Sequence, residues 1–495
     1  MKGLAYLTQT LGTWLIVGVL GILPLFFLPL TQDFYDTPKW FLLVSLSLVL
    51  TLIWTVRSLV TQTVTVSRSP AADRMAAMEL ASLLSLAFAS TNRVEALLTP
   101  YGAGTWISLA LLFLVGETFL SQKSRTMLQT VIVSGASILG VLAVYQFFGL
   151  GKVMAPTLSF LADPRFTPTG TLIGLATVLA LTLPLALDSA FHNVRHQKDI
   201  AFSLCVVAAV LILGGFVATV WQLLPMLPAT LLPLSSGWAI TLEALKTGKQ
   251  VLVGVGAENF LSAFTRGRPV ALNNTLLWNI RFTANSSLLL HIVTTYGLVG
   301  LAGMVFLLRS FLVPFRASPV ALGKLLAILI IFVVQPQFVA LILITAILLI
   351  DNADDPGIVS FHVKQSHRHH RVWTTLFYFL GLLCIASTGV ALYLVGRAYG
   401  AERSFYQALE AAQRGEGKPT YELHVTAISG NPFVARFHIG ASATSLALAQ
   451  TLAKPAESTA SGMSSTDRQI ATQLVQQSID EAKIAVNLSP TSVIS

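Results

Sequence analysis

The chain has 495 residues, of which 54% are hydrophobic and only 11% are charged, and its formal net charge is +9. An average soluble protein carries roughly 25% charged residues, so this chain lacks the polar side chains to cover a compact surface of its size. The composition excludes an ordinary soluble protein and a disordered chain, and it indicates a membrane protein.

Eleven apolar runs are candidates for membrane-spanning helices, because a bilayer core about 30 Å thick needs about 20 apolar residues in a helix. They cover residues 11–31, 40–56, 76–91, 104–121, 127–149, 169–190, 200–221, 287–308, 320–334, 337–350 and 372–395. Gln335-Pro336-Gln337 separates two short runs, which form two spans, one kinked span or a re-entrant hairpin. The first run lacks a small-residue cleavage site and is interpreted as an anchor. We predict an all-α fold of about eleven transmembrane helices.

The basic residues predict the orientation of these helices, because Lys and Arg in short loops tend to stay cytoplasmic. With the amino terminus in the cytoplasm, fourteen basic residues fall in cytoplasmic segments. The short external loops hold four, which are Lys39, Arg93, Lys152 and Arg165. The positive charge is therefore interpreted as a topology signal, and no nucleic-acid partner is expected.

Two segments are too polar and too long to be simple turns: a loop at 222–286 and a tail at 396–495. Under the predicted orientation both lie outside the cytoplasm, on the same side. We therefore divide the chain into a membrane domain, residues 1–395, and a soluble tail. Cys205 and Cys384 both fall inside predicted spans, so we expect no disulfide framework, no metal and no cofactor.

The tail is predicted to be a small helical module. Thr466-Asp467-Arg468-Gln469 has the pattern of a capping box at the start of a helix. An apolar stripe on one face of that helix follows, made of Ile470, Leu474, Ile479, Ala482 and Val486. Residues 427–432 and 485–490 share a pattern of Ala, a β-branched residue and a closing Pro, which resembles the end of a tetratricopeptide repeat. The alternatives are a repeat-like module, incomplete or completed by a protein partner, and a single amphipathic helix.

The external loop begins with an amphipathic pattern. Trp238, Leu242 and Leu245 recur at helical spacing, which predicts a helix along the membrane surface. Gly254-Val255-Gly256 follows and predicts a tight turn, because a dinucleotide-binding loop would need a third glycine at position 259.

The same loop is unusually basic for an external segment. It carries Arg266, Arg268 and Arg281 with two lysines, against only two acidic residues. Solvated loop charges are one interpretation. The other is that guanidinium groups bind phosphate through paired hydrogen bonds. In that case these arginines, together with Arg165, hold the pyrophosphate of a lipid-linked donor.

From Trp238 to about Leu308 the chain resembles the O-antigen ligase/polymerase superfamily of bacterial membrane glycosyltransferases. The similar features, in chain order, are a Trp-led helix, Gly254-Val255-Gly256 with Asn259-Phe260, an arginine-bearing loop, and Gly297-Leu298-Val299-Gly300 in the next span. Arg165-Phe166 before a Thr/Pro/Gly turn is also similar to that family. A tetratricopeptide-like tail fits the same resemblance.

The resemblance implies an inverting, metal-independent enzyme of the bacterial inner membrane. It would transfer or polymerise a glycan from an undecaprenyl-diphosphate carrier in cell-surface polysaccharide synthesis, with external arginines that stabilise the leaving diphosphate. It also implies a histidine near the start of the post-loop helix, where this chain has Ser286.

The nearest histidine to that position is His291, about 140° further around a helix. An ionisable side chain inside a span is a functional candidate, so His291 joins the four arginines in the predicted site. The absent histidine leaves two other functions open. One is a non-catalytic assembly protein whose tail recruits partners, and the other is a transporter of a lipid-linked glycan.

Overall fold

The computed structural model describes residues 2–154, 159–197, 199–312, 319–351, 357–362, 370–458 and 464–490. Its first part comprises α1 (Lys2–Ile22), α2 (Asp36–Thr61), β1 (Thr63–Ser67), α3 (Pro70–Phe88), α4 (Arg93–Leu98), α5 (Ala103–Leu114), η1 (Gly116–Phe119), α6 (Gln122–Phe147), α7 (Gly151–Met154), η2 (Ser159–Ala162), α8 (Leu172–Arg195) and α9 (Asp199–Leu223).

The second part begins with short helices and returns to long ones. It comprises η3 (Leu224–Met226), α10 (Leu227–Thr230), α11 (Leu234–Ala244), α12 (Gly248–Val253), η4 (Ala257–Asn259), α13 (Phe260–Gly267), η5 (Val270–Asn274), α14 (Leu288–Leu312), α15 (Pro319–Val333), α16 (Phe338–Asp351), β2 (Ile358–His362), α17 (His370–Gln413), α18 (Gly417–Gly430), α19 (Ala435–Ser458) and α20 (Ser465–Leu488).

Seven helices of the described chain are long and apolar enough to cross a membrane: α1, α2, α6, α8, α9, α14 and α17. The apolar segments α5 with η1, α15 and α16 are shorter. Each predicted run overlaps a helix, and the run at 76–91 falls on α3. The chain is thus a helical protein of multi-pass character, and the total of eleven spans stays a prediction. The first span ends at Ile22 rather than at residue 31, because Pro24 and Pro29 interrupt the helix.

Small residues let two of the long helices approach closely. Gly140 on α6 faces Gly215 on α9, and a Cβ added to either glycine would collide with the backbone of the other helix. Such small-residue contacts are the usual means by which helices pack in a bilayer.

A buried ion pair holds four segments together at one end of the bundle. The carboxylate of Glu117 lies 3.2 Å from the guanidinium of Arg125, and both side chains are almost fully buried. Glu117 also accepts hydrogen bonds from the hydroxyls of Ser67 and Ser69, and Arg125 donates to the carbonyl of Leu349. A buried charge is tolerated only when it is paired in this way, so the cluster fixes β1, η1, α6 and α16.

Two short strands interrupt the helical fold at that end. β1 and β2 pair antiparallel, with Thr63 opposite His362 and Ser67 opposite Ile358. The all-α prediction is confirmed apart from this ribbon, which joins segments that lie far apart in the sequence.

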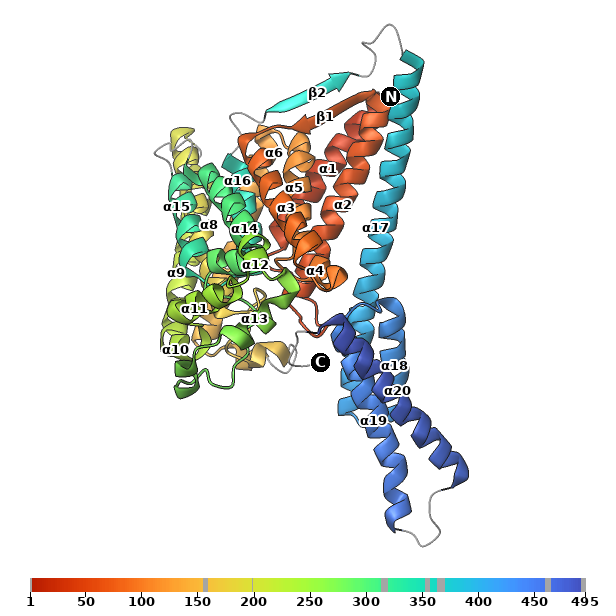
Figure 1. Ribbon diagram of the computed structural model, residues 1–495. Coiled ribbons are helices and arrows are strands. Elements are labelled where there is room, and N and C mark those ends of the chain that lie inside the picture. The colour runs from red at the N-terminus through yellow and green to blue at the C-terminus, as the bar shows by residue number, and fades with distance from the viewer. Residues whose placement is uncertain are drawn as a thin grey trace.

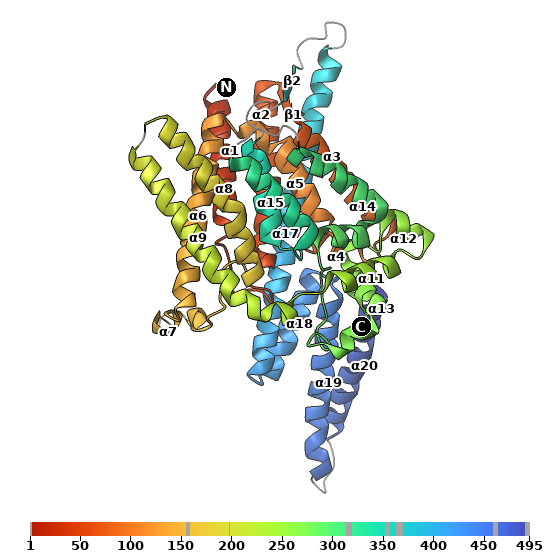
Figure 2. The ribbon, with the colours of Figure 1, turned by 90° about the vertical axis from the view of Figure 1, so that its left-hand side faces the viewer.

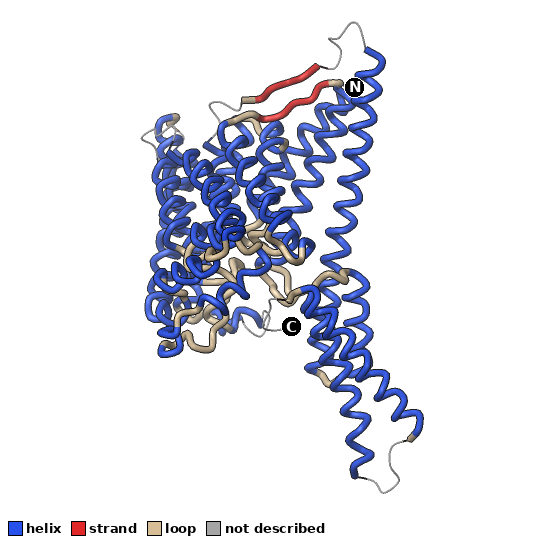
Figure 3. The backbone as a smooth tube through the Cα atoms, viewed as in Figure 1, coloured by secondary structure: helices blue, strands red, loops and turns tan. Residues whose placement is uncertain are grey.

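The long loop and the tail lie at the same end of the molecule. The amino terminus and both strands lie at one end, and α11, α13 and α18–α20 lie at the other (Figure 1; Figure 2). Figure 3 shows irregular segments gathered toward the end that holds the loop and the tail. α17 has 44 residues, or roughly 66 Å at 1.5 Å per residue. It therefore runs without a break through the predicted domain boundary at residues 395–396.

The tail helices pack in chain order, with Phe405, Ala427 and Phe437 in their shared core. α18 and α20 end alike, because the buried alanines Ala427 and Ala485 each accept a 3.0 Å hydrogen bond from the backbone of the residue four positions on. The two segments with the repeated pattern therefore occupy equivalent helix ends. Membership of the tetratricopeptide class stays a prediction.

Two details predicted for α20 are wrong. The N-cap is Ser464 rather than Thr466, and its hydroxyl accepts a 3.0 Å hydrogen bond from the Asp467 amide. Ile479 and Val486 of the predicted apolar stripe are each 45% exposed, whereas Ser478 and Ala485 face α19 and are buried. The buried positions of α20 therefore include small side chains that the predicted apolar stripe left out.

We predict that Glu117→Ala destabilises the fold by about 3–5 kcal/mol, because it leaves the Arg125 cation buried without its partner. Thermal unfolding of the purified protein in detergent measures this loss. Glu422→Ala on the exposed face of α18 is the control and should unfold like the wild type. An unchanged melting temperature for Glu117→Ala would show that the ion pair contributes nothing.

Candidate functional site

The helix predicted from Trp238 forms and docks through a glycine. α11 covers Leu234–Ala244, and Trp238 and Leu242 on its outer face are 55% and 51% exposed. A Cβ on Gly237 would collide with the side chains of Asn285 and Ser286, so the glycine lets α11 lie directly on the segment before α14. The exposed apolar face fits a helix at the membrane surface.

The two glycine motifs contact each other. Gly254 and Gly256 have φ angles of +73° and +92°, and Gly297 breaks α14 with a φ of +66°. A Cβ on Gly297 would lie 2.5 Å from the carbonyl oxygen of Leu252, and one on Gly254 would collide with the backbone of Thr295. Only glycine fits at both positions. The turn predicted at 254–256 is thus the surface that meets the break in α14.

The break in α14 supplies acceptors for the turn. The amides of Val255 and Gly256 donate hydrogen bonds of 3.1 and 3.0 Å to the carbonyls of Thr294 and Thr295. The hydroxyl of Ser85 on α3 donates to the same Thr295 carbonyl at 3.0 Å. These partners satisfy backbone groups that an unbroken helix would use internally.

Asn285 is the centre of a buried polar network. Its side-chain nitrogen lies 3.0 Å from both the Thr241 hydroxyl of α11 and the Thr294 hydroxyl of α14. Its side-chain oxygen accepts a 2.7 Å hydrogen bond from the Ser286 amide. Ser286 itself is 4% exposed and lies beneath α11, against Gly237.

His291 is buried and has aromatic neighbours. It is 3% exposed, and its ring lies 5.0 Å from that of Phe260 and 5.7 Å from that of Tyr101, between centroids. Its Nδ1 accepts a 3.4 Å hydrogen bond from the backbone N–H of Asn285. These contacts orient the ring toward the core of the site rather than toward solvent.

Glu258 connects the glycine turn to α4. Its carboxylate accepts hydrogen bonds from the backbone of Thr91 at 2.8 Å and Asn92 at 3.4 Å, and from the Ser90 hydroxyl at 3.2 Å. Burial raises the pKa of Glu258, and these hydrogen bonds oppose the rise. The carboxylate therefore holds the backbone just before α4, whose N-cap is Asn92, and ties it to the turn.

The three loop arginines differ in whether their guanidinium groups have partners among the described residues. A small apolar cluster beneath the loop contains Leu232, Ile240, Phe260, Phe264, Leu272, Leu277 and Phe282. Arg268 lies over the ring of Phe264 and donates to the carbonyl of Trp278. Arg266 and Arg281 are exposed, and in the described part of the chain neither forms a hydrogen bond or an ion pair. Two cations are therefore available to an anionic ligand.

Arg165 belongs to a separate part of the same end. It is exposed in the segment between η2 and α8, where its amide donates a 2.9 Å hydrogen bond to Asp163. The buried Lys39 of α2 holds this segment by a 2.7 Å hydrogen bond to the Pro168 carbonyl. Figure 2 shows α7, just before this segment, and α13 at opposite sides of the molecule. Arg266, Arg268 and Arg281 thus belong to one loop of the structure, and Arg165 belongs to a different one.

Several residues of this unit are not in the sequence prediction. Thr241, Asn285 and Thr294 form the polar network, and Glu258 binds the backbone just before α4. Thr294 lies inside the predicted span, where polar side chains are costly unless they are paired, and that cost was the available signal for it. Asn285 lies in the predicted loop, where no such signal exists.

Comparison of the chain with models of known protein families, with curated proteins and with solved structures finds no match.

We expect Gly254→Ala and Gly297→Ala each to destabilise the protein by about 2–5 kcal/mol, because both add left-handed strain and a backbone collision. The melting temperature and the yield of folded protein in detergent measure the effect. Gly248→Ala is the matched control, since a Cβ there meets no atom within 4 Å. If Gly254→Ala melts like Gly248→Ala, the contact between the two motifs is not needed for folding.

Proposed function

We propose that the chain is a membrane glycosyltransferase of the O-antigen ligase type. It transfers or polymerises a glycan from an undecaprenyl-diphosphate carrier in cell-surface polysaccharide synthesis. The proposed location is the bacterial inner membrane, with the amino terminus in the cytoplasm and the loop and tail outside. The proposal includes about eleven spans and a tetratricopeptide-like tail that contacts a protein partner.

The contact between the two glycine motifs is the observation that carries this proposal. The features that resemble the family are spread from Trp238 to Leu308, and they meet in one packed unit of α11, the glycine turn and the break at Gly297. A chance resemblance of separate short motifs would not require them to be in contact. The contact therefore supports treating them as one functional element.

The exposed arginines supply the proposed chemistry. A departing diphosphate carries charge that grows in the transition state, and fixed cations lower the energy of that charge. Arg266 and Arg281 are the two loop arginines without partners among the described residues. The guanidinium of Arg268 already donates a hydrogen bond to the carbonyl of Trp278. We therefore assign diphosphate binding to Arg266 and Arg281, with Arg268 as a residue that shapes the loop.

A scaffold is the second candidate, and the docked tail favours it. The side chain of Asn92 donates a 2.6 Å hydrogen bond to the Phe433 carbonyl of the tail, and Arg436 donates a 3.0 Å hydrogen bond to Gln32 of the α1–α2 segment. A tail attached in this way would present its exposed α20 face to a partner without any transfer reaction. An assay of transfer separates the two candidates.

We expect the purified protein to release glycan from a radiolabelled undecaprenyl-diphosphate glycan. Arg266→Ala and Arg281→Ala should each lower the rate about 10²–10³-fold, the usual loss on removal of one charge-stabilising group. Arg165→Ala and Arg268→Ala are measured in the same series, as is His291→Gln.

Arg414→Ala is the matched control, because Arg414 is an exposed tail arginine paired with Glu416. It should release glycan at the wild-type rate. If the wild type binds the lipid but releases nothing, the transferase proposal fails and the scaffold is favoured. If Arg266→Ala and Arg281→Ala match an active wild type, the assigned site is wrong.

A further inference from the structure

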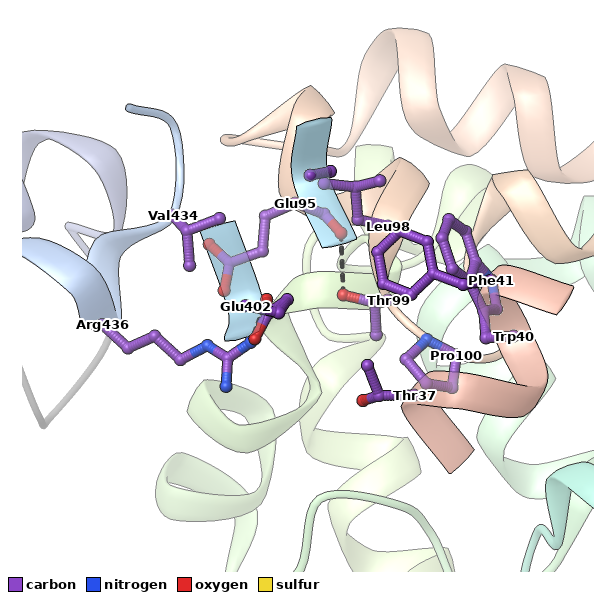
Figure 4. Close-up of a pocket in the computed structure, with 11 residues that line it drawn as sticks. Thr37, Trp40, Phe41, Glu95, Leu98, Thr99, Pro100, Glu402, Val434 and Arg436 are labelled. Atoms are coloured by element: carbon purple, nitrogen blue, oxygen red, sulfur yellow. Dashed lines mark hydrogen bonds and ion pairs between the residues drawn. The ribbon is translucent and has the colours of Figure 1, made fainter. Parts of the chain in front are cut away.

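A cavity lies where the tail meets the membrane domain. It has a volume of about 180 Å³, and its lining comes from α2, α4 with the segment after it, α17, and the start of α19. Figure 4 shows Glu95, Glu402 and Arg436 on one side of this cavity and the rings of Trp40 and Phe41 on the other. The space exceeds that of a single water site and suits a group of several heavy atoms.

Among the described residues that line the cavity, the one cation already has partners. Arg436 forms an ion pair with Glu402 and donates to Gln32. Its guanidinium also lies 5.6 and 5.4 Å from the ring centroids of Phe405 and Phe437. These contacts hold the guanidinium beside the tail helices.

Glu95 is left without an ion-pair partner among the described residues. Its carboxylate accepts a 3.1 Å hydrogen bond from the Asn92 side chain. The pKa of Glu95 is raised to about 7, chiefly by burial. Glu258 from η4 and Glu402 from α17 contribute to this rise, whereas Arg436 from α19 and the hydrogen bond from Asn92 oppose it. The negative charge at Glu95 is therefore only partly balanced by the protein.

The opposite wall is suited to a cation. The rings of Trp40 and Phe41 stand edge to face, 4.9 Å apart between centroids, and both side chains are buried. Aromatic faces attract ammonium groups, and more strongly where water is excluded. A half-buried carboxylate across a cavity from two aromatic rings is a combination that suits such groups.

We propose that this cavity binds a primary ammonium group, with Glu95 as its counter-ion and Trp40 and Phe41 as its aromatic wall. The group belongs either to a soluble amine or to the head group of an ammonium-bearing lipid. The lipid head group is a source close to the cavity, because Trp40 and Phe41 lie near the start of α2, a candidate membrane span. This site is independent of the proposed transfer reaction.

Calorimetric titration of the purified full-length protein with ethanolamine tests the site. Ethanolamine stays protonated at pH 6 and pH 8, whereas a carboxyl with a pKa of about 7 changes from mostly protonated to mostly ionised. The affinity should therefore be about tenfold higher at pH 8 than at pH 6. Ethylene glycol, an uncharged molecule of similar size, should not bind at either pH.

Glu95→Gln should lose most of the affinity and all of the pH dependence. Phe41→Leu keeps an apolar wall without the ring and should bind several-fold more weakly, which tests the site through a second residue. Glu422→Gln on α18 is the matched control and should bind like the wild type. Equal binding of ethanolamine and ethylene glycol would overturn the proposal. So would wild-type binding by a folded Glu95→Gln variant, as judged by its melting temperature.

Lipid nanodiscs distinguish the two sources of the ammonium group. If the bilayer fills the site, ethanolamine should bind at least tenfold more weakly in phosphatidylethanolamine discs than in phosphatidylglycerol discs. Equal affinity in the two discs assigns the site to a soluble amine. Absence of ethanolamine binding in micelles and in both kinds of disc would overturn the ammonium site.

Discussion

Gly254 and Gly297 bring two backbones closer together than any side chain would allow. The left-handed break at Gly297 leaves carbonyls of α14 without helical partners, and the amides of Val255 and Gly256 occupy them. In a low-dielectric setting every such backbone group needs a partner, so the break and the turn stabilise each other. The rest of the loop is built on this contact, because η4 and α13 continue directly from the turn.

The glycine turn is also connected to the tail, through α4 and the residues just before it. Glu258 follows the turn and accepts hydrogen bonds from the backbone of Thr91 and Asn92 just before α4, and the Asn92 side chain donates to the Phe433 carbonyl. α4 also carries Glu95, which lines the cavity shared with the tail. A movement of the tail would break contacts on the same short helix that the turn holds. The loop unit and the tail therefore both contact α4 or the few residues just before it.

Local signals were sufficient for most helices, and long-range contacts were not visible in the sequence. Apolar runs predicted helices because burial of the backbone in lipid requires them. The glycine turn was also predictable, since its conformation is local. The pairing of β1 with β2 and the cavity between Glu95 and Glu402 join segments hundreds of residues apart, and no local pattern encodes them. The apolar stripe predicted for α20 was wrong because the buried positions include Ser478 and Ala485, whose small side chains a pattern of large apolar residues does not reveal.

Under the proposed function, the replacement of the family histidine by Ser286 bears on the acceptor rather than on the donor. A diphosphate leaves as an anion and needs charge stabilisation, which exposed arginines can provide without a proton. An acceptor hydroxyl must instead lose a proton to a base within hydrogen-bonding reach. Ser286 and His291 are both buried beneath α11 and its neighbours, so neither meets an acceptor at the surface. Under this proposal the base that accepts the acceptor's proton is therefore a residue other than Ser286 and His291, or a group of the acceptor itself.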